Sequence, residues 1–210
     1  NNAVVSADYS YFLSMDWDPG YRARRIVELI EADESISLVD MQTIQRDSTP
    51  LYAQDILHWI VALQPEEPRL QAALDLLRSW DGRADRESAG AAMFEALRIE
   101  LIKATFEDEL GQQLLSRSRA YLIAALSNLL GQPDAAWFDN VRTPEVEDQE
   151  ATILVALAAA VDYLSETLGD EMNGWRWGDL HTATFENQSL GQSGIAPIEW
   201  IFNRGPVEAD

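Results

Sequence analysis

The chain has 210 residues, of which 47% are hydrophobic and 9% aromatic, which is enough apolar surface for a folded core and too much for a disordered chain. Fifteen Lys and Arg residues against 36 Asp and Glu give a formal charge of −21. This charge argues against binding to nucleic acid or to an anionic membrane surface, because both need clustered positive charge. The chain has no cysteine, so it has neither a disulfide framework nor a thiolate metal site.

The first 18 residues show no helical period and are expected to be irregular or short extended structure. Pro19-Gly20 then marks the start of a helix that runs to about residue 32. In this helix Ile26, Leu29 and Ile30 fall at positions i, i+3 and i+4, a spacing that predicts a buried apolar stripe.

Six more helical segments follow. A capping box, Ser37-Leu-Val-Asp40, opens the first of them, and Gly111 is a weak break between two of the later ones. The last has an apolar run, residues 151–161, that is too short to span a bilayer, which needs about 20 residues, so a central buried helix is expected. The six segments cover residues 37–46, 50–63, 68–80, 88–109, 114–130 and 151–168.

The helical pattern fades after Gly169, and residues 173–210 are expected to be loops with one or two short strands or turns. The sequence therefore predicts a mostly α fold, with about seven helices in one domain over residues 1–210 and irregular, short-strand ends. The start of the chain lacks the charged-then-apolar pattern of a signal peptide. Because it begins with Asn instead of Met, we expect a processed or excised piece of a longer protein.

Sequence motifs stand near both ends of the chain. The first part contains Asn1-Asn2-Ala-Val-Val5 and, further on, Asp16-Trp-Asp-Pro-Gly-Tyr-Arg-Ala-Arg-Arg-Ile26, and the last part contains Trp175-Arg-Trp-Gly-Asp-Leu-His181 and Phe202-Asn-Arg-Gly-Pro206. In this order they resemble the large (β) subunit of the penicillin acylase family, whose members are N-terminal-nucleophile hydrolases. The resemblance implies a helical fragment of an amidohydrolase that lacks the N-terminal nucleophilic serine.

The resemblance also implies roles for four residues. Asn1 matches the asparagine whose side-chain N–H stabilises the oxyanion of the tetrahedral intermediate, and Arg25 matches the active-site arginine. Asn2 is expected in a supporting place beside the substrate, and Trp17, with Tyr11 and Phe12, is a candidate for the acyl pocket. Without the resemblance, the two asparagines would be interpreted as a frayed end or a turn.

For the other residues singled out, a structural role is the competing interpretation. Arg25 would pair with Glu28 or Asp18 or lie over the helix surface, while Arg22, three residues away, shares its face. The aromatic side chains would pack in a core or an interface.

The resemblance implies no organic cofactor, but family members often hold a structural calcium ion. Asp8, Asp16 and Asp18 are candidate ligands, and their register does not choose among them, so the metal stays open. The two histidines do not suggest a catalytic set: Asp55 and His58 are expected to be a solvent-facing pair or to include a capped core histidine, and His181 to have a structural role. The usual serine-hydrolase, zinc and nucleotide motifs are absent from the sequence.

The leading hypothesis is thus part of an enzyme that hydrolyses a linear amide between an acyl group and an amine, with β-lactams or acyl-homoserine lactones as substrate types. Its expected partners are the missing sheet of the large subunit, the small subunit and the small-molecule amide. The isolated chain should be inactive and should associate weakly with itself. A periplasmic or extracellular place is favoured over the cytoplasm for the longer enzyme.

Two alternatives stay open. One is a non-catalytic helical module used for binding or as a scaffold. The other is a metal-dependent hydrolase built on acidic residues, for which two widely separated histidines are a weak basis.

Overall fold

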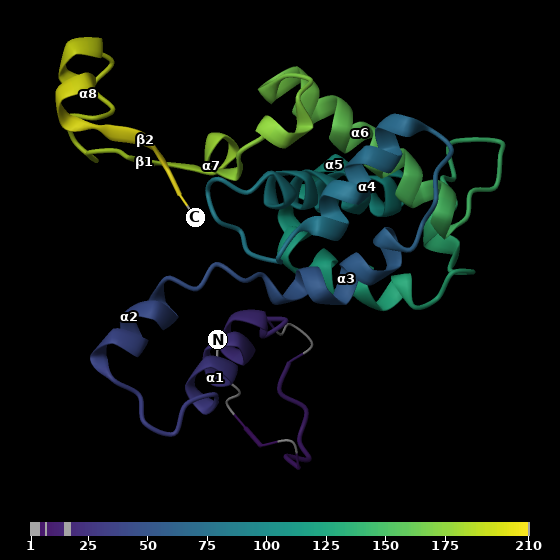
Figure 1. Ribbon diagram of the computed structural model, residues 1–210, viewed down its shortest axis with the longest axis horizontal. Helices are drawn as coiled ribbons and strands as arrows, with labels where there is room; N and C mark the ends of the chain where they lie inside the picture. Colours follow the sequence, from purple (N-terminus) through teal and green to yellow (C-terminus); the bar gives the residue numbers. More distant parts are fainter. Residues whose placement is uncertain (1–4, 7, 15–17, 210) are drawn as a thin grey trace.

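The computed structural model describes residues 5–6, 8–14 and 18–209, with the backbone alone for 117–120. Four helices, α3 to α6, form a helical body, and α1 and α2 lie beside it (Figure 1). An arm made of β1, α8 and β2 projects from the body beyond the short helix α7. The elements in chain order are α1 (Tyr21–Glu31), α2 (Leu38–Gln45), α3 (Leu51–Val61), α4 (Pro68–Ser79), α5 (Ala89–Leu130), η1 (Ala136–Phe138), α6 (Gln149–Leu168), η2 (Met172–Gly174), α7 (Trp177–Leu180), β1 (Thr182–Phe185), α8 (Ala196–Phe202) and β2 (Arg204–Glu208).

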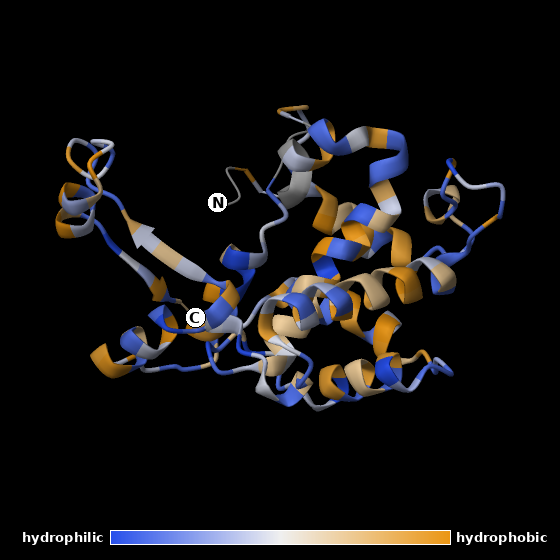
Figure 2. Cartoon of the chain, turned by 90° about the horizontal axis from the view of Figure 1, so that it is seen from above, coloured by the Kyte–Doolittle hydropathy of each residue, from blue (hydrophilic) through white to orange (hydrophobic). Residues whose placement is uncertain are grey.

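The core lies between α5 and α6; α4 packs against both of these helices, and α3 packs against α5 and α4. In Figure 2, hydrophobic segments occur where the helices of the body face one another. The apolar stripe of α4 is buried as its spacing indicates. The mostly α fold and the seven predicted helical segments are confirmed. The largest fully buried side chains are Trp175, Phe94, Phe138, Ile56, Ile60, Leu74, Leu77, Met93, Leu97, Leu101, Leu126 and Leu130.

The long helix α5 contains the break that the sequence predicts. Gly111 has φ 70° and ψ 159°, a backbone conformation that is essentially restricted to glycine. The side-chain oxygen of Ser88 caps the start of α5 by accepting a hydrogen bond from the N–H of Ala91 at 3.1 Å. The kink divides α5 into the two predicted segments, both of which contribute to the core.

The buried stripe predicted for α1 is wrong, because α1 has no buried residue. Ile26 and Ile30 are 44% and 41% exposed, and Leu29 is only half-buried. The helix meets the body mainly through Tyr21, whose ring lies edge-on to that of Tyr52 with centroids 5.8 Å apart. The spacing of the apolar residues correctly indicated a helix, but no described segment covers the stripe.

The next helix, α2, begins as predicted. The Ser37 side chain accepts from the N–H of Asp40, and the Asp40 carboxylate accepts from the N–H of Ser37 at 2.8 Å. This reciprocal pair satisfies two of the free N–H groups at the helix start. It confirms the capping box.

The helix α6 is longer than its apolar run. Over the part of the chain that the structure describes, it is the one helix long and apolar enough to cross a membrane, so the argument from length made on residues 151–161 does not hold. Its buried residues, which include Ile153, Leu157 and Leu164, form one face that packs against α5 and α4. Val155 and Tyr163 are exposed, so the helix is central but is not buried all round.

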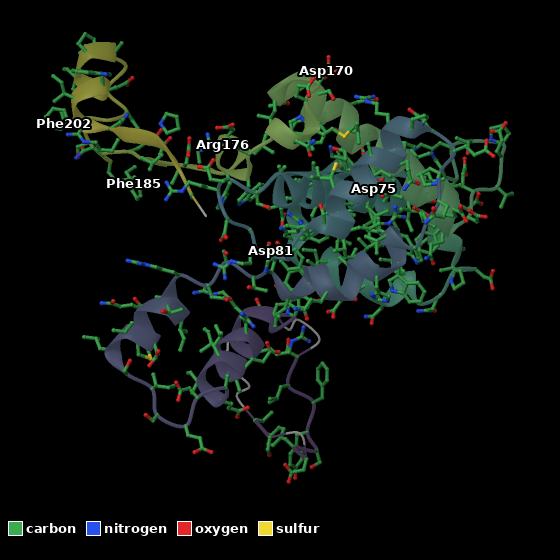
Figure 3. All side chains as sticks on the ribbon, in the orientation of Figure 1. Asp75, Asp81, Asp170, Arg176, Phe185 and Phe202 are labelled. Carbon is green, nitrogen blue, oxygen red and sulfur yellow. The ribbon has the colours of Figure 1, made fainter. Side chains whose placement is uncertain are left out.

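The C-terminal part contains the predicted short strands and two helices that were not predicted, α7 and α8. The strands β1 and β2 pair antiparallel, with Thr182 opposite Glu208 and an irregularity between Ala183 and Phe185. Figure 3 shows Phe185 and Phe202 in the arm, far from the body, and Arg176 where the arm begins. Several apolar residues of the arm are exposed, with Trp200 at 82%.

Candidate functional site

Arg25, the predicted active-site arginine, is held by a carboxylate that the sequence analysis did not identify. Its Nε donates to Oδ2 of Asp47 at 2.8 Å, and its Nη2 donates to Oδ1 of Asp47 at 2.7 Å. Such a two-point pair fixes the plane of a guanidinium as well as its position. Glu28, the partner proposed from the sequence, lies further away, at 3.6 Å from Nη1.

Asp47 follows the end of α2, and its own geometry is fixed by Thr49. The Thr49 hydroxyl donates to Oδ1 of Asp47 at 3.2 Å, and the Thr49 N–H donates to Oδ2 at 3.4 Å. The hydrogen bonds from Arg25 hold the pKa of the Asp47 carboxyl below its ordinary value, although partial burial acts in the opposite direction. The carboxylate is therefore ionised at neutral pH.

The segment that carries Asp47 is attached to the helical body. The Ser48 hydroxyl donates to Oδ1 of Asp85 at 2.5 Å, and the Ser48 carbonyl accepts from the N–H of Ala84 at 2.9 Å. Pro50 then leads into α3. Because Ser48 is tied to Asp85 and Ala84, and the chain enters α3 at Pro50, the carboxylate of Asp47 has a defined place relative to the helical body.

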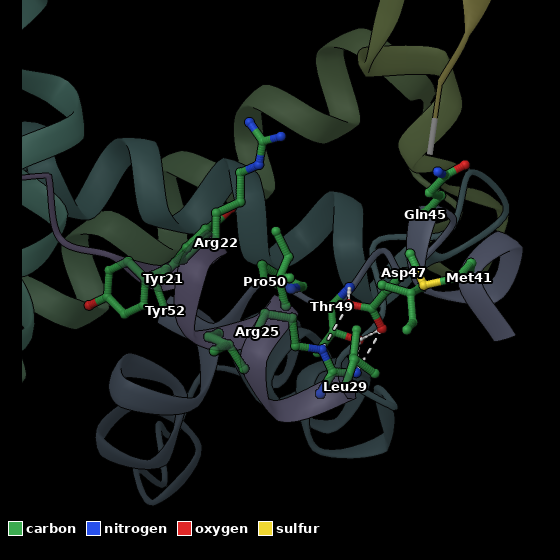
Figure 4. Close-up of a pocket in the computed structure, with 13 residues that line it drawn as sticks. Tyr21, Arg22, Arg25, Leu29, Met41, Gln45, Asp47, Thr49, Pro50 and Tyr52 are labelled. Carbon is green, nitrogen blue, oxygen red and sulfur yellow. Dashed lines mark hydrogen bonds and ion pairs between the residues drawn. The ribbon is translucent and has the colours of Figure 1, made fainter. Parts of the chain in front are cut away.

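Arg25 and Asp47 line a cleft of about 470 Å³ between α1, α2 and the start of α3 (Figure 4). Its lining combines polar and apolar side chains, a combination that suits a small molecule with an apolar part and a polar group. The lining residues are Tyr21, Arg22, Arg25, Ile26, Leu29, Met41, Ile44, Gln45, Asp47, Thr49, Pro50, Leu51 and Tyr52.

The other two arginines of α1, Arg22 and Arg24, are not held by a two-point pair with any described carboxylate. Arg24 lies 3.7 Å from Glu28 and 3.9 Å from Asp55, and its guanidinium lies over the ring of Tyr21. Arg22 extends away from Arg25 in Figure 4. It has no hydrogen-bond or ion-pair partner among the described residues. Arg25 is thus the one of the three that is rigidly placed at the cleft.

Most of the other predicted site residues lie outside the described residues. These are Asn1, Asn2, Trp17 and the calcium candidate Asp16, so their proximity to Arg25 remains a prediction. Tyr11 and Phe12 are described and are 75% and 78% exposed. They therefore do not pack in a core of the described chain.

The described calcium candidates give no coordination site. Asp18 accepts a hydrogen bond from the N–H of Gly20 at 2.8 Å. The hydrogen bond from Ser6 lowers the pKa of the exposed Asp8 carboxyl. No group of three or more His, Cys, Asp or Glu side chains able to hold a metal occurs where the structure is described. Calcium binding stays untested.

The two histidines have local partners. His58 is exposed, with its Nδ1 3.2 Å from the carbonyl of Gln54 and its ring beside Trp59. His181 stacks on Trp177 with centroids 4.8 Å apart. Its carbonyl accepts from the N–H of Ala209 at 2.9 Å, where the arm joins α7. This geometry fits the structural role expected for His181.

A partly buried polar cluster of Tyr52, Glu95 and Arg98 lies near Pro50. The hydroxyl of Tyr52 donates to Oε1 of Glu95 at 2.5 Å, and Nη2 of Arg98 lies 2.6 Å from Oε2. Burial first, and then the charge of Glu95, raise the pKa of the Tyr52 hydroxyl. Tyr52 and Arg98 thus supply the partners that the buried carboxylate of Glu95 requires. The geometry of this cluster needs no ligand to explain it.

Sequence reasoning therefore singled out Arg25, whose active-site role stays a prediction, but not the residues that hold it, Asp47 and Thr49. The signal was weak: a polar run, Arg46-Asp-Ser-Thr-Pro50, between two helices reads as a turn. The pair joins residues 22 positions apart, and helical periodicity carries no information on such contacts.

Fold and site together describe a helical protein with an ordered guanidinium at the edge of a cleft. A family model described as penicillin amidase matches residues 1–210. The acyl-homoserine lactone acylase QuiP of Pseudomonas aeruginosa is 31% identical over 239 residues, covering all of this chain and 28% of that protein. QuiP of Pseudomonas fluorescens Pf0-1 is 32% identical over 218 residues, covering 94% of this chain and 27% of that protein.

A more distant relative is penicillin acylase 2 proenzyme of Pseudomonas sp. SE83, which is 25% identical over 197 residues, 91% of this chain and 24% of that protein. The chain thus spans about a quarter of the length of the curated relatives it matches. Since the family model covers every residue, the chain belongs to the penicillin amidase family.

Proposed function

We propose that the chain is one part of an amidohydrolase that cleaves a linear amide between an acyl group and an amine. Membership of the penicillin amidase family supports this reaction type. Relatives named as acyl-homoserine lactone acylase and penicillin acylase support acyl-homoserine lactones and β-lactams as substrate types.

Asn1 and Arg25 are the chain's contributions to the chemistry. The attacking hydroxyl is that of a serine outside these 210 residues, whose own α-amino group takes the proton. Asn1 donates its side-chain N–H to the oxygen that becomes negative in the tetrahedral intermediate. Asn2 supports the substrate beside it, and Trp17 lines the acyl pocket.

The observation that carries the proposal is the fixed guanidinium of Arg25. Nε and Nη2 are occupied by Asp47, and Nη1 has no hydrogen bond to any residue that the structure describes, since Glu28 is 3.6 Å away. Nη1 is held only by this longer, exposed ion pair with Glu28, which Asn1 or the substrate would displace to accept hydrogen bonds from its planar donors.

The rest of the longer protein is the proposed partner, and it covers apolar surface that is open here. Trp200 and Phe185 of the arm are 82% and 66% exposed, and such groups mark contact surfaces. Light scattering over a concentration series tests the expected weak self-association of the chain alone, and a monodisperse monomer contradicts it.

The test of the function is hydrolysis of chromogenic phenylacetyl and long-chain acyl amides. The full protein that carries these residues should turn over, and the 210-residue chain alone should not. Asn1→Ala should lower kcat by about 10²–10³-fold. Arg25→Ala should also lower the rate, whereas Arg24→Ala, a neighbour with exposed partners, should change it little.

Two results would contradict the proposal. Full activity of the Asn1→Ala protein would remove the oxyanion role. Equal effects of Arg25→Ala and Arg24→Ala would mean that Arg25 has no special place in the site, as expected for a non-catalytic helical module.

A further inference from the structure

We propose that Asp47 is the positioning residue of Arg25: its carboxylate, held by Thr49 and attached to the body through Ser48, sets the place and plane of the guanidinium. This inference rests on the proposed function, because it assigns the residue through which the structure controls the active-site arginine. Asp47 itself does not touch the reacting atoms.

The first step is that α1 alone does not place Arg25. The helix has no buried residue and no side-chain cap at its start, and it meets the body through Tyr21 and a long ion pair of Arg24 with Asp55 at 3.9 Å. A side chain on so lightly packed a helix has several accessible rotamers, and ordering it needs a partner from outside the helix.

The second step is that Asp47 is the partner able to do this. The Asp47 side chain is 11% exposed and accepts two charge-assisted hydrogen bonds from Arg25. Glu28 is 44% exposed, stands on α1 itself and is shared with Arg24. An exposed ion pair at this distance contributes little to ordering, so the constraint comes from Asp47.

The third step is that Asp47 is held by contacts other than its pair with Arg25. Both of its carboxylate oxygens accept hydrogen bonds from Thr49, and the Thr49 hydroxyl also accepts from Nη2 of Arg25 at 3.4 Å. Ser48, between them, is tied to Asp85 at 2.5 Å and to Ala84. The body therefore reaches Arg25 through three links: the hydrogen bond from Ser48 to Asp85, the peptide bond between Ser48 and Asp47, and the pair of Asp47 with Arg25.

The consequence concerns which edge of the guanidinium faces the reaction. With Nε and Nη2 bound to Asp47, Nη1 is the least constrained edge within the described chain, since its partner there is the exposed Glu28 at 3.6 Å. An asparagine at position 47 keeps the shape but offers an N–H₂ group to one of the two donors of Arg25, so one hydrogen bond and the charge are lost. The guanidinium can then rotate away from its working position.

The experiment is a double-mutant cycle in the full protein that carries these residues. Asp47→Asn should lower kcat by about 10²-fold, as expected when a working group is displaced by about 1 Å, with a small change in KM. In an Arg25→Ala background the same substitution should have no further effect, because the two residues act as one unit.

A matched control is Asp162→Asn, which breaks the tertiary ion pair between Arg69 of α4 and Asp162 of α6, away from the cleft. It should leave kcat unchanged. An equal loss from Asp47→Asn with and without Arg25 would show that Asp47 acts on stability or on another group, and would overturn the proposal.

A second measurement separates failure of this inference from failure of the proposed function. In ¹⁵N-labelled protein the Nε–H signal of Arg25 should exchange slowly with water, and should exchange rapidly after Asp47→Asn but not after Asp162→Asn. Slow exchange without amide hydrolysis would leave the positioning role intact and reject the enzyme function. Rapid exchange in the unchanged protein would reject the positioning role, whatever the activity.

Discussion

The guanidinium of Arg176 lies between the carboxylates of Glu87 and Glu208. It donates to both oxygens of Glu87, at 2.6 and 2.7 Å, and to Oε2 of Glu208 at 2.9 Å. Glu87 precedes α5, and Glu208 ends β2. One side chain thus joins the helical body to the last strand of the arm, and these hydrogen bonds raise the pKa of Arg176 above its ordinary range.

Arg176→Ala should free the arm from the body without unfolding the body. The three groups are solvent-accessible, so the loss acts on the orientation of the arm and little on global stability. Hydrogen exchange of the β1 and β2 amides should become faster, while that of α5 and α6 stays the same. Arg204→Ala is the control, because Arg204 bonds only to carbonyls of Ile201 and Asn203 within the arm; faster exchange in both variants would argue against the link.

Gly111→Ala should destabilise the fold by about 1–3 kcal/mol, because a Cβ is strained at φ 70° and ψ 159°. Gly131 provides the comparison: its φ is −80°, and a Cβ there would meet the carbonyl oxygen of Asn128 at an ordinary 3.6 Å. Gly131→Ala should therefore be neutral within about 0.5 kcal/mol. Urea unfolding of both variants decides the matter, and a neutral Gly111→Ala would mean that α5 can straighten.

Leu157→Ala on α6 should cost about 2–5 kcal/mol, because it opens a cavity in the core. Val155→Ala, two residues away, should change stability by less than about 0.5 kcal/mol, since Val155 is 62% exposed and Leu157 is fully buried. Thermal unfolding followed by circular dichroism gives both values. A larger loss of stability from Val155→Ala than from Leu157→Ala would mean that the face of α6 that carries Val155 is packed against another segment.

The pair of Arg25 and Asp47 should stabilise the fold at neutral pH and not in strong acid. The folded-state pKa of Asp47 is lowered from its ordinary 3.8, so the contribution is full above that value and is lost as the pH falls through the lower, folded-state pKa. The unfolding free energy of Asp47→Asn should be about 1 kcal/mol below that of the unchanged chain at pH 7. The difference should shrink as the pH falls below 3.8 and through the folded-state pKa; a difference that does not change with pH would point to packing instead of charge.

The sequence predicted the helices well because local signals determine them. Ser37 with Asp40, the proline at residue 50 and the glycine at 111 are all where the structure begins or breaks a helix. The short helices α7 and α8 were missed, because four and seven residues carry too little of a 3.6-residue period.

Which helix face is buried was predicted less well. The stripe of Ile26 and Ile30 on α1 has the spacing of a core face yet is exposed, while α4 with the same spacing is buried. Periodicity reports that an apolar face exists but not what lies against it. The same limit applies to the candidate site, where resemblance identified Arg25 and only three-dimensional contacts identified Asp47.

Asn203, in one of the motifs that carry the family resemblance, has a purely architectural place. Its Oδ1 accepts from the N–H of Asn187, and its Nδ2 donates to the carbonyl of Gly191, both at 3.0 Å. A Cβ at position 191 would stand 2.0 Å from that same Oδ1. The absence of a side chain at Gly191 therefore lets Asn203 approach and hold the loop through its two hydrogen bonds. A homologue that had lost its catalytic groups would need these hydrogen bonds as much as an active enzyme. The motif therefore indicates membership of the family and does not by itself indicate activity.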